Sequence, residues 1–382
     1  MSVTTTMLRG YILAPDGFVD GSVAFDGARI ASIAGTPVDE GRVRDGSQPI
    51  VLPGFIDLHV HGGAGRDIME GGDAALRVAA LHARHGTTSL LATTMTAPQE
   101  DLDAAFAAMA ECARRHEAGE RGGARVLGVH LEGPYINTAK LGAQPDFARP
   151  LAMDELMRLH RMAPIRLVTL APEIPENMDT IAALTEAGFR VQLGHTAGSY
   201  EDAVAALQKG ATGFTHLFNA MTGLHHRAPG MAGAALAHAR YAEIIPDLLH
   251  VHPGAIRAAL RAIPCLYCVT DSTAAAGMPE GEYRLGQNTV YKCMNGVRLA
   301  DGTLAGSSLT MDQALRNLVD ALGLDLADAS RRMSTHAADH IGETARGRLA
   351  VGAFADAVVL DRDLNLLDVY VEGVAIEHAH AG

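Results

Sequence analysis

The sequence predicts an α/β protein: a (β/α)8 TIM barrel that carries a small β-sandwich domain built from both chain ends. Between residues 55 and 345, eight strand-like apolar runs alternate with amphipathic helical patterns, which is typical of a parallel sheet with helices outside it. Both chain ends contain only short β segments separated by turns. We therefore expect residues 1–54 and 346–382 to form one small β domain, with the barrel, residues 55–345, between its two halves.

The first fifty residues have the pattern of β-hairpins. Asp16-Gly17 and Asp26-Gly27 each separate two short β-type runs, and Asp-Gly is a strong signal for a tight hairpin turn. A similar pattern of short β-type runs separated by turns occurs after residue 346. Neither end has enough strands to bury a core by itself, so the two ends are expected to pair.

The middle of the chain alternates strands and helices. The runs interpreted as strands are FIDLHVH, TSLLATT, RVLGVHLE, IRLVTLA, RVQLGH, GFTHLF, EIIPDLLHV and LYCVTD. Helical patterns separate most of them. One helix has a capping box at Ser199 and Asp202 and a stop at Gly210. The stretch after Pro229, with Gly230 and Gly233, is interpreted as a turn that gives the backbone room.

Composition narrows the classes of function. The chain has 382 residues, is 48% apolar and carries a net charge of −13, which argues against nucleic acid or an anionic membrane as the main partner. An anionic small ligand needs only local positive groups and stays open. Four cysteines are too few for a disulfide scaffold, and no run approaches 20 apolar residues. We therefore expect a reduced, cytoplasmic protein without a membrane span or signal peptide.

Ionisable residues gather at the ends of the expected strands. Parallel barrel strands all end at one mouth, where active sites form. A full set of such residues at successive strand ends predicts a metal site there. The residues are His59, His61, Glu132, His195, His216, His250 and Asp271.

The sequence spacing of these residues suggests that they form two groups of metal ligands. His195 and His216 are 21 residues apart, which is one helix and one strand, so they should end neighbouring strands. With Glu132 they form a set of two histidines and a carboxylate that leaves a coordination position open, as in catalytic zinc sites. Iron, manganese and cobalt suit the same ligands. His59 and His61 share one strand face and could hold a second ion.

Two further points concern that site. Either Glu132 or Asp271 could bridge two ions. Strand four, IRLVTLAPE, has no lysine, which speaks against the carboxylated lysine of many binuclear barrels. His130 shares a strand face with Glu132 and is interpreted as a satisfied core histidine or a support for the ligands.

These residues lie in longer motifs that resemble a known family. The motifs, running in order from residue 53 to about 319, are PGFIDLHVHG, HLEGPYIN, GHTAGSY, THLFNAM, RAPGMAGA, LLHVHP, VTDSTAAAG and LADGTLAGSSLTMDQALRNLV. On them the sequence is similar to the amidohydrolase superfamily and, within it, to the N-acetylglucosamine-6-phosphate deacetylase family. HLEGP, THLFNAM and GSSLTM together are specific to that family, whereas a bare HxH is not.

The resemblance implies a metal-dependent hydrolysis of the acetamide of N-acetyl-D-glucosamine 6-phosphate. Glu132, His195 and His216 would bind the main metal, and Asp271 would act as general base and acid. The HxH pair is the variable part of the family pattern, so it argues for a second ion, with Asp271, and not for the first. The resemblance leaves open one or two ions per subunit.

The resemblance also implies how the phosphorylated amino sugar is held. His250 would contact a sugar hydroxyl, and Asn219 and Ala220 would meet the phosphate together with Arg227. In the family that arginine comes from the neighbouring subunit, which implies a homodimer. One position departs from the pattern: Gln144 stands where relatives carry a histidine near the scissile carbonyl. Its amide can still donate a hydrogen bond to a developing oxyanion, but it cannot be cationic.

Other functions stay open from the sequence alone. The galacto epimer or another N-acyl sugar could be the substrate. Another amidohydrolase reaction, such as that of a deaminase or a cyclic-amide hydrolase, would not need Arg227. A catalytically inactive barrel that serves as a binding module should have lost ligands, and none of the expected ones is missing.

Overall fold

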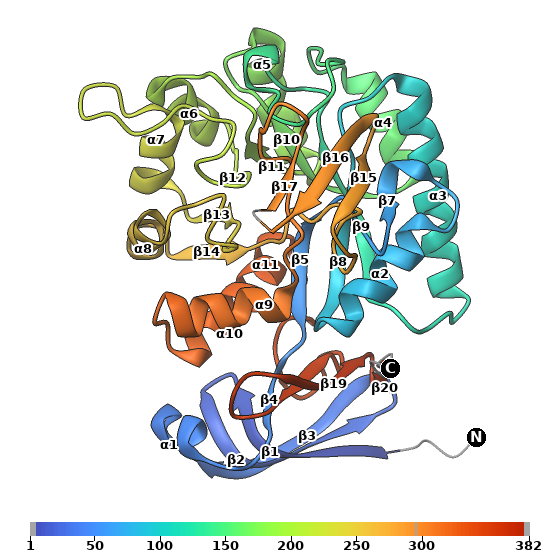
Figure 1. The fold of residues 1–382 in the computed structure, drawn as a ribbon, viewed down its shortest axis with the longest axis vertical. Helices are drawn as coiled ribbons and strands as arrows, with labels where there is room; N and C mark the ends of the chain where they lie inside the picture. The colour runs from blue at the N-terminus through green and yellow to red at the C-terminus, as the bar shows by residue number, and fades with distance from the viewer. Residues whose placement is uncertain (1–4, 295, 378–382) are drawn as a thin grey trace.

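A computed structural model describes residues 5–294 and 296–377 of the chain. Within them, eight parallel strands alternate with helices and curl into a barrel, and a separate β-sheet lies below it (Figure 1). The barrel strands are β5 (Phe55–Val60), β8 (Thr87–Thr93), β9 (Arg125–Glu132), β10 (Ile165–Leu170), β11 (Arg190–Leu193), β12 (Gly213–Phe214), β13 (Tyr241–Ile244) and β14 (Cys265–Cys268). The predicted fold class is confirmed.

Backbone hydrogen bonds close the barrel. Strands β5 to β12 pair in sequence order, and β13 pairs with β14. Leu217 N–H donates to Glu243 C=O at 2.9 Å and connects the turn after β12 to β13. Asp271 N–H donates to His59 C=O at 2.9 Å and returns the chain to β5. The first and last strands therefore meet at the carboxyl end of the barrel.

Helices surround the strands, and their ends follow the expected signals. Ser199 and Asp202 form the predicted capping box of α6. Proline occupies the first turn of α5 and of α8, where its missing N–H costs nothing. The helices between barrel strands are α2 (Ala74–Arg84), α3 (Gln99–Glu117), α4 (Met153–Met162), α5 (Pro175–Glu186), α6 (Tyr200–Gln208), α7 (Gly230–His238) and α8 (Pro253–Ala262).

Helix α7 corrects the interpretation of the stretch after Pro229 as a turn. Gly230 to Ala235 are all buried and small or apolar. Such a helix has no polar face, so its sequence lacks the 3.6-residue alternation by which amphipathic helices are recognised.

Several elements beyond β14 complete the mouth and flank of the barrel. A three-stranded antiparallel sheet, which the sequence did not predict, follows β14 and precedes the last helices. The bounds are β15 (Gly281–Leu285), β16 (Asn288–Cys293), β17 (Gly296–Arg298), α9 (Met311–Arg316), η3 (Asn317–Ala321), α10 (Leu326–Met333) and α11 (Thr335–His340). Smaller elements are α1 (Glu40–Asp45), β6 (Gly62–Gly63), β7 (Arg66–Asp67), η1 (Ile68–Glu70) and η2 (Thr138–Lys140).

The two chain ends pair in one seven-stranded sheet, as expected. Its order is β20-β19-β18-β4-β1-β2-β3, and β4 lies between strands from the two ends. The strands are β1 (Thr5–Ala14), β2 (Gly17–Asp26), β3 (Arg29–Pro37), β4 (Ile50–Pro53), β18 (Ala357–Leu360), β19 (Leu366–Val371) and β20 (Val374–Ala375). Ile30 N–H donates to Ala353 C=O, so the edge at β3 meets the segment that leads into β18. The sheet thereby curls around an apolar core of its own.

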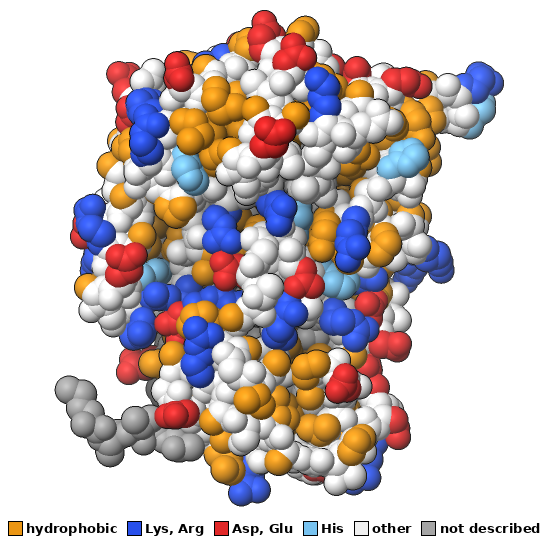
Figure 2. All heavy atoms as spheres, turned by 180° about the vertical axis from the view of Figure 1, so that it is seen from behind, with side chains coloured by type: hydrophobic (Ala, Val, Ile, Leu, Met, Phe, Trp, Pro, Cys, Tyr) orange, Lys and Arg blue, Asp and Glu red, His pale blue; other side chains and the backbone are white. Residues whose placement is uncertain are grey.

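On the face shown in Figure 2, Lys and Arg side chains are most frequent across the middle of the molecule, with acidic side chains among and around them. Within residues 5–294 and 296–377, no helix combines the length and the hydropathy that crossing a bilayer requires.

A buried ion cluster connects the barrel to the terminal sheet. Arg346 donates to Asp356 Oδ2 at 2.5 Å and to Glu372. Arg125, at the start of β9, lies 3.1 Å from Glu372. Asp356 and Glu372 flank β18 and β19, so removing Arg346 would leave two buried carboxylates with too little compensating charge.

We expect Arg346→Met to lower the free energy of unfolding by about 3–5 kcal/mol, because breaking a buried ion pair leaves an uncompensated charge. Urea unfolding measures the change. The control is Arg348→Met, since Arg348 pairs with Asp339 near the surface and should contribute about 1 kcal/mol or less. Equal losses in the two variants would contradict the role of the cluster.

Candidate metal centre

A pocket of about 380 Å³ lies at the carboxyl ends of the barrel strands. It collects side chains from β9 and from the turns after β5, β11, β12 and β14, because parallel strands deliver their ends to one mouth. All but one of the expected ligands line it; His59 lies just beneath. The lining includes His61, Glu132, Lys140, Gln144, His195, His216, Asn219, Ala220, His250 and Asp271.

Glu132, His195 and His216 meet in a compact group. His195 Nε2 lies 3.1 Å and His216 Nε2 3.0 Å from Glu132 Oε1, and the two Nε2 atoms are 3.0 Å apart. His195 Nδ1 donates to the backbone carbonyl of Lys140 at 2.8 Å. That bond turns Nε2 of His195 toward the other two ligand atoms.

The geometry of this trio fits a divalent cation. A tetrahedral site with ligands about 2.0–2.1 Å from the ion sets neighbouring ligand atoms roughly 3.3 Å apart, close to the separations observed. When neutral, His195 has its proton on Nδ1, so Nε2 presents a lone pair to a carboxylate oxygen. Lone pairs this close require positive charge between them. These buried clusters are consistent with a divalent metal site of the kind that amidohydrolases have.

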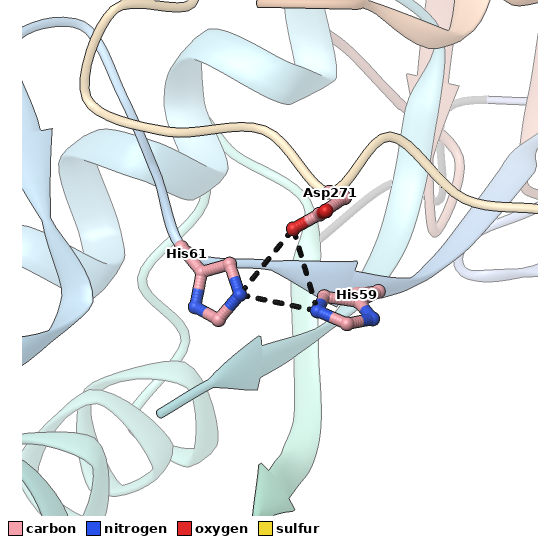
Figure 3. Close-up of side chains that lie close together, drawn as sticks. All are labelled: His59, His61 and Asp271. Carbon is pink, nitrogen blue, oxygen red and sulfur yellow. Dashed lines mark hydrogen bonds and ion pairs between the residues drawn. The ribbon is translucent and has the colours of Figure 1, made fainter. Parts of the chain in front are cut away.

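His59, His61 and Asp271 form a second group (Figure 3). His59 Nε2 and His61 Nε2 are 3.1 Å apart, and Asp271 Oδ1 lies 3.5 and 3.4 Å from them. The other carboxylate oxygen of Glu132 faces this group, at 3.1 Å from His61 Nε2 and 3.4 Å from His59 Nε2. Glu132 thus lies between the two groups, one oxygen toward each.

The electrostatics of the cluster favour positive charge. Burial alone would lower the pKa of His59, but the carboxylates of Glu132, Glu243 and Asp271 outweigh it and hold that pKa well above its ordinary value. Against the same effect of burial, Asp271 and Glu132 raise the pKa of His61 to about 9. Burial opposes ionisation of Glu132, yet His59 and His195 keep its pKa well below the usual range. Positive charge is stabilised at this position, and metal binding would displace protons from it.

Three site residues adopt unusual backbone conformations. His195, His216 and Asp271 have φ values of 48°, 29° and 50°, in the left-handed region that non-glycine residues seldom occupy. Each stands at the point where a strand gives way to its loop. Such strain persists where the surrounding structure over-determines it, and it clusters at active sites.

Glu243 is a site residue that the sequence analysis missed. It lies fully buried on β13, where Oε2 accepts from His59 Nδ1 at 2.9 Å and from His216 N–H at 3.1 Å. Tyr267 O–H donates to its other oxygen at 3.4 Å. Glu243 therefore anchors one residue of each group, His59 in the second and His216 in the first. A glutamate inside the apolar run YAEIIP was the available signal, because a carboxylate in a buried strand needs partners.

His130 lies one layer deeper in the barrel. Its Nδ1 donates to Leu58 C=O at 3.0 Å, and its Nε2 lies 2.7 Å from Thr169 Oγ1. Burial, with His59 nearby, holds its pKa well below the ordinary value. Both ring nitrogens are occupied, as in a satisfied core histidine.

The expected substrate residues divide between the pocket and the surface. Gln144, Asn219, Ala220 and His250 line the pocket. His250 lies in the loop after β13 and not on the strand, because Pro246 follows β13 and lacks an N–H. Nδ1 of His250 donates to Asp247 Oδ2 at 2.7 Å. Arg227 lies in an exposed loop between β12 and α7 that projects from the barrel edge (Figure 1), outside the pocket lining of this chain.

Comparison with known proteins agrees with this geometry. The sequence pattern of the amidohydrolase family matches residues 50–376. An N-acetylglucosamine-6-phosphate deacetylase of Lysinibacillus sphaericus is 39% identical, with 84% of each chain covered. An N-acetylgalactosamine-6-phosphate deacetylase of Escherichia coli O157:H7 is 39% identical, with 90% of this chain and 91% of that protein covered.

Solved structures show the same similarity. A mutant N-acetyl-D-glucosamine-6-phosphate deacetylase of Mycobacterium smegmatis, in complex with N-acetyl-D-glucosamine-6-phosphate, superposes with a TM-score of 0.88 at 32% identity, covering 98% of this chain and 99% of that one. The Thermotoga maritima N-acetylglucosamine-6-phosphate deacetylase superposes with a TM-score of 0.88 at 29% identity, covering 98% of this chain and 100% of that one.

We expect Glu243→Ala to lower the free energy of unfolding by about 2–3 kcal/mol, because the N–H groups of His59 and His216 would stay buried without an acceptor. Urea unfolding of the metal-free protein measures this. Glu282→Ala, at an exposed position on β15, is the control and should cost less than about 0.5 kcal/mol. A Glu243 variant as stable as the control would exclude this anchoring role.

Proposed function

Because the chain belongs to the amidohydrolase family, we propose that it hydrolyses the acetamide of N-acetyl-D-glucosamine 6-phosphate to glucosamine 6-phosphate and acetate. The observation that carries the proposal is the open trio of Glu132, His195 and His216, with Asp271 beside it in one pocket. The galacto epimer is the second candidate, since a deacetylase of N-acetylgalactosamine 6-phosphate is equally similar in sequence. Deaminase or cyclic-amide chemistry has no comparable support.

In this proposal Glu132, His195 and His216 hold the main divalent ion, zinc in the first instance. His59, His61 and Asp271 are the residues available to a second. When bound, the ion supplies Lewis acidity, which polarises the amide carbonyl and lowers the pKa of water to about 7.

Asp271 is the proposed proton carrier. Burial would raise its pKa, but His59 and His61 lower it below the ordinary value, so the side chain is a carboxylate at neutral pH. It can accept the proton of the attacking water and then deliver it to the leaving nitrogen. An unassisted amine is a poor leaving group, and general acid–base catalysis removes that barrier.

The substrate contacts in this proposal are those that the family resemblance implies, and His250, Asn219 and Ala220 line the pocket. His250 faces the sugar hydroxyls, and the Asn219–Ala220 turn faces the phosphate. Arg227 reaches the phosphate from a second copy of the chain, so the proposal includes a homodimer. Its exposed position supports such a contact, and guanidinium suits bidentate binding of phosphate.

Gln144 has a defined part in this arrangement. Its Nε2 donates to Glu132 Oε2 at 2.7 Å, and its Oε1 accepts from Thr96 N–H at 2.6 Å. These two bonds fix which way the amide points. The second proton on Nε2 remains for the scissile carbonyl, so the neutral amide can serve where relatives have a histidine.

We expect the purified protein to release acetate from N-acetylglucosamine 6-phosphate, and a chelator to abolish the release. Parallel assays with the galacto epimer rank the two substrates by kcat/KM, and restoring a divalent ion after chelation is the control. If neither sugar phosphate yields chelator-sensitive acetate, another amidohydrolase reaction becomes the better hypothesis.

We expect Asp271→Asn to reduce kcat by about 10²- to 10⁴-fold, the usual range for loss of a general acid–base group. The trio of the main site is untouched, so metal content there should stay near that of the wild type. Steady-state kinetics and elemental analysis measure both. Asp301→Asn, an exposed substitution, controls for loss of a carboxylate, and turnover near the wild-type level in Asp271→Asn would refute the role.

A further inference from the structure

The pocket contains a single permanent cation among the residues that the structure describes. Of the side chains that line it, Lys140 is the one lysine or arginine. The chain has only two other lysines, Lys209 and Lys292. The carboxyl side chains that line the pocket are those of Glu132 and Asp271, so the phosphate of a substrate is expected to lie away from them, beside a positive group.

The backbone of Lys140 is held firmly beside the metal ligands. Its N–H donates to Asn137 C=O at 2.9 Å, and its C=O accepts from His195 Nδ1 at 2.8 Å. Both contacts use main-chain atoms. The side chain is therefore free of a structural duty at the ligands, and replacing it should leave His195 in place.

The ammonium group of Lys140 reaches the turn that follows β12. Its Nζ lies 3.5 Å from the carbonyl oxygen of Met221, directly after the Asn219–Ala220 turn. Phe218 and Ala220 in that turn have φ values of 82° and 49°. The N–H of Asn219 donates to His216 C=O at 3.0 Å, so the N–H of Ala220 is the backbone donor that this turn can offer an anion. The cation and the turn thus border the same part of the pocket.

Arg227 of the same chain does not supply this charge. It lies in the exposed loop and donates toward His226 Nε2 at 2.9 Å, outside the pocket lining. Lys140 therefore provides positive charge from within the chain that holds the catalytic groups, whether or not a second copy is bound.

We propose that Lys140 binds the phosphate of the substrate in cis, together with the Asn219–Ala220 turn, and so selects sugar phosphates over unphosphorylated N-acetyl sugars. This rests on the proposed function and adds a specificity residue to it. An ammonium group beside the N–H of Ala220 can bind phosphate as a point charge.

The test compares Lys140→Met and Lys140→Arg with the wild type on N-acetylglucosamine 6-phosphate and on N-acetylglucosamine. We expect Lys140→Met to raise KM for the phosphorylated sugar by about 10- to 100-fold, the usual loss for a hydrogen bond to a charged group. It should leave kcat/KM for the unphosphorylated sugar and the metal content unchanged. Lys140→Arg should restore much of the affinity.

Lys209→Met is the matched control. Lys209 follows α6, where it pairs with Asp179 at 3.5 Å, and its loss should change neither substrate. Equal effects of Lys140→Met on the two sugars would overturn the proposal, as would reduced metal content with unchanged selectivity.

A binding measurement separates this proposal from the proposed function. Calorimetry of the metal-loaded protein with glucose 6-phosphate and with inorganic phosphate requires no turnover. If the wild type releases no acetate but binds glucose 6-phosphate, and Lys140→Met weakens that binding, the phosphate site stands while the deacetylase assignment fails. If the wild type binds neither probe, or Lys140→Met binds them as tightly, the phosphate site is refuted.

Discussion

The carboxylate of Glu132 is the group on which the pocket depends. One oxygen faces His195 and His216, and the other faces His59, His61 and Gln144. A single ionised side chain at the end of β9 thus orders two histidine groups that come from opposite sides of the barrel. Its low pKa and the raised pKa of His59 are two consequences of this sharing. A buried carboxylate can stay ionised only with such compensation.

The barrel supports this arrangement from below. Glu243 connects His59 to the backbone of His216, and Tyr267 donates to the other oxygen of Glu243. His130 has its own partners one layer deeper. The bond to Glu243 restricts the imidazole of His59 to the orientation in which its Nε2 faces His61 and Glu132. The strain at His195, His216 and Asp271 is sustained by the same packed surroundings. The geometry of the pocket therefore depends on the packing of the barrel beneath it.

The terminal sheet is attached to the barrel by charge as well as by chain connection. Strand β4 runs into β5 through Gly54 alone. Arg346 binds Asp356, which directly precedes β18, and Glu372, which directly follows β19. These contacts lie at the end of the barrel next to the terminal sheet (Figure 1), whereas the pocket lies at the carboxyl ends of the strands. The usual division of the TIM barrel applies, with stability at one end and chemistry at the other.

The sequence by itself determined the eight strands, most of the helices, the pairing of the chain ends and the ionisable residues that gather at the strand ends. Periodicity carries that information locally, and parallel strands deliver every strand end to the same mouth. Helix α7 escaped detection because its first six residues are all buried and none of them is polar. Only the tertiary structure decided which oxygen of Glu132 faces which imidazole, that Glu243 anchors both groups, and that Arg227 lies outside while Lys140 lines the pocket. These are relations between residues far apart in the chain, and they depend on distances across the barrel that no local pattern encodes.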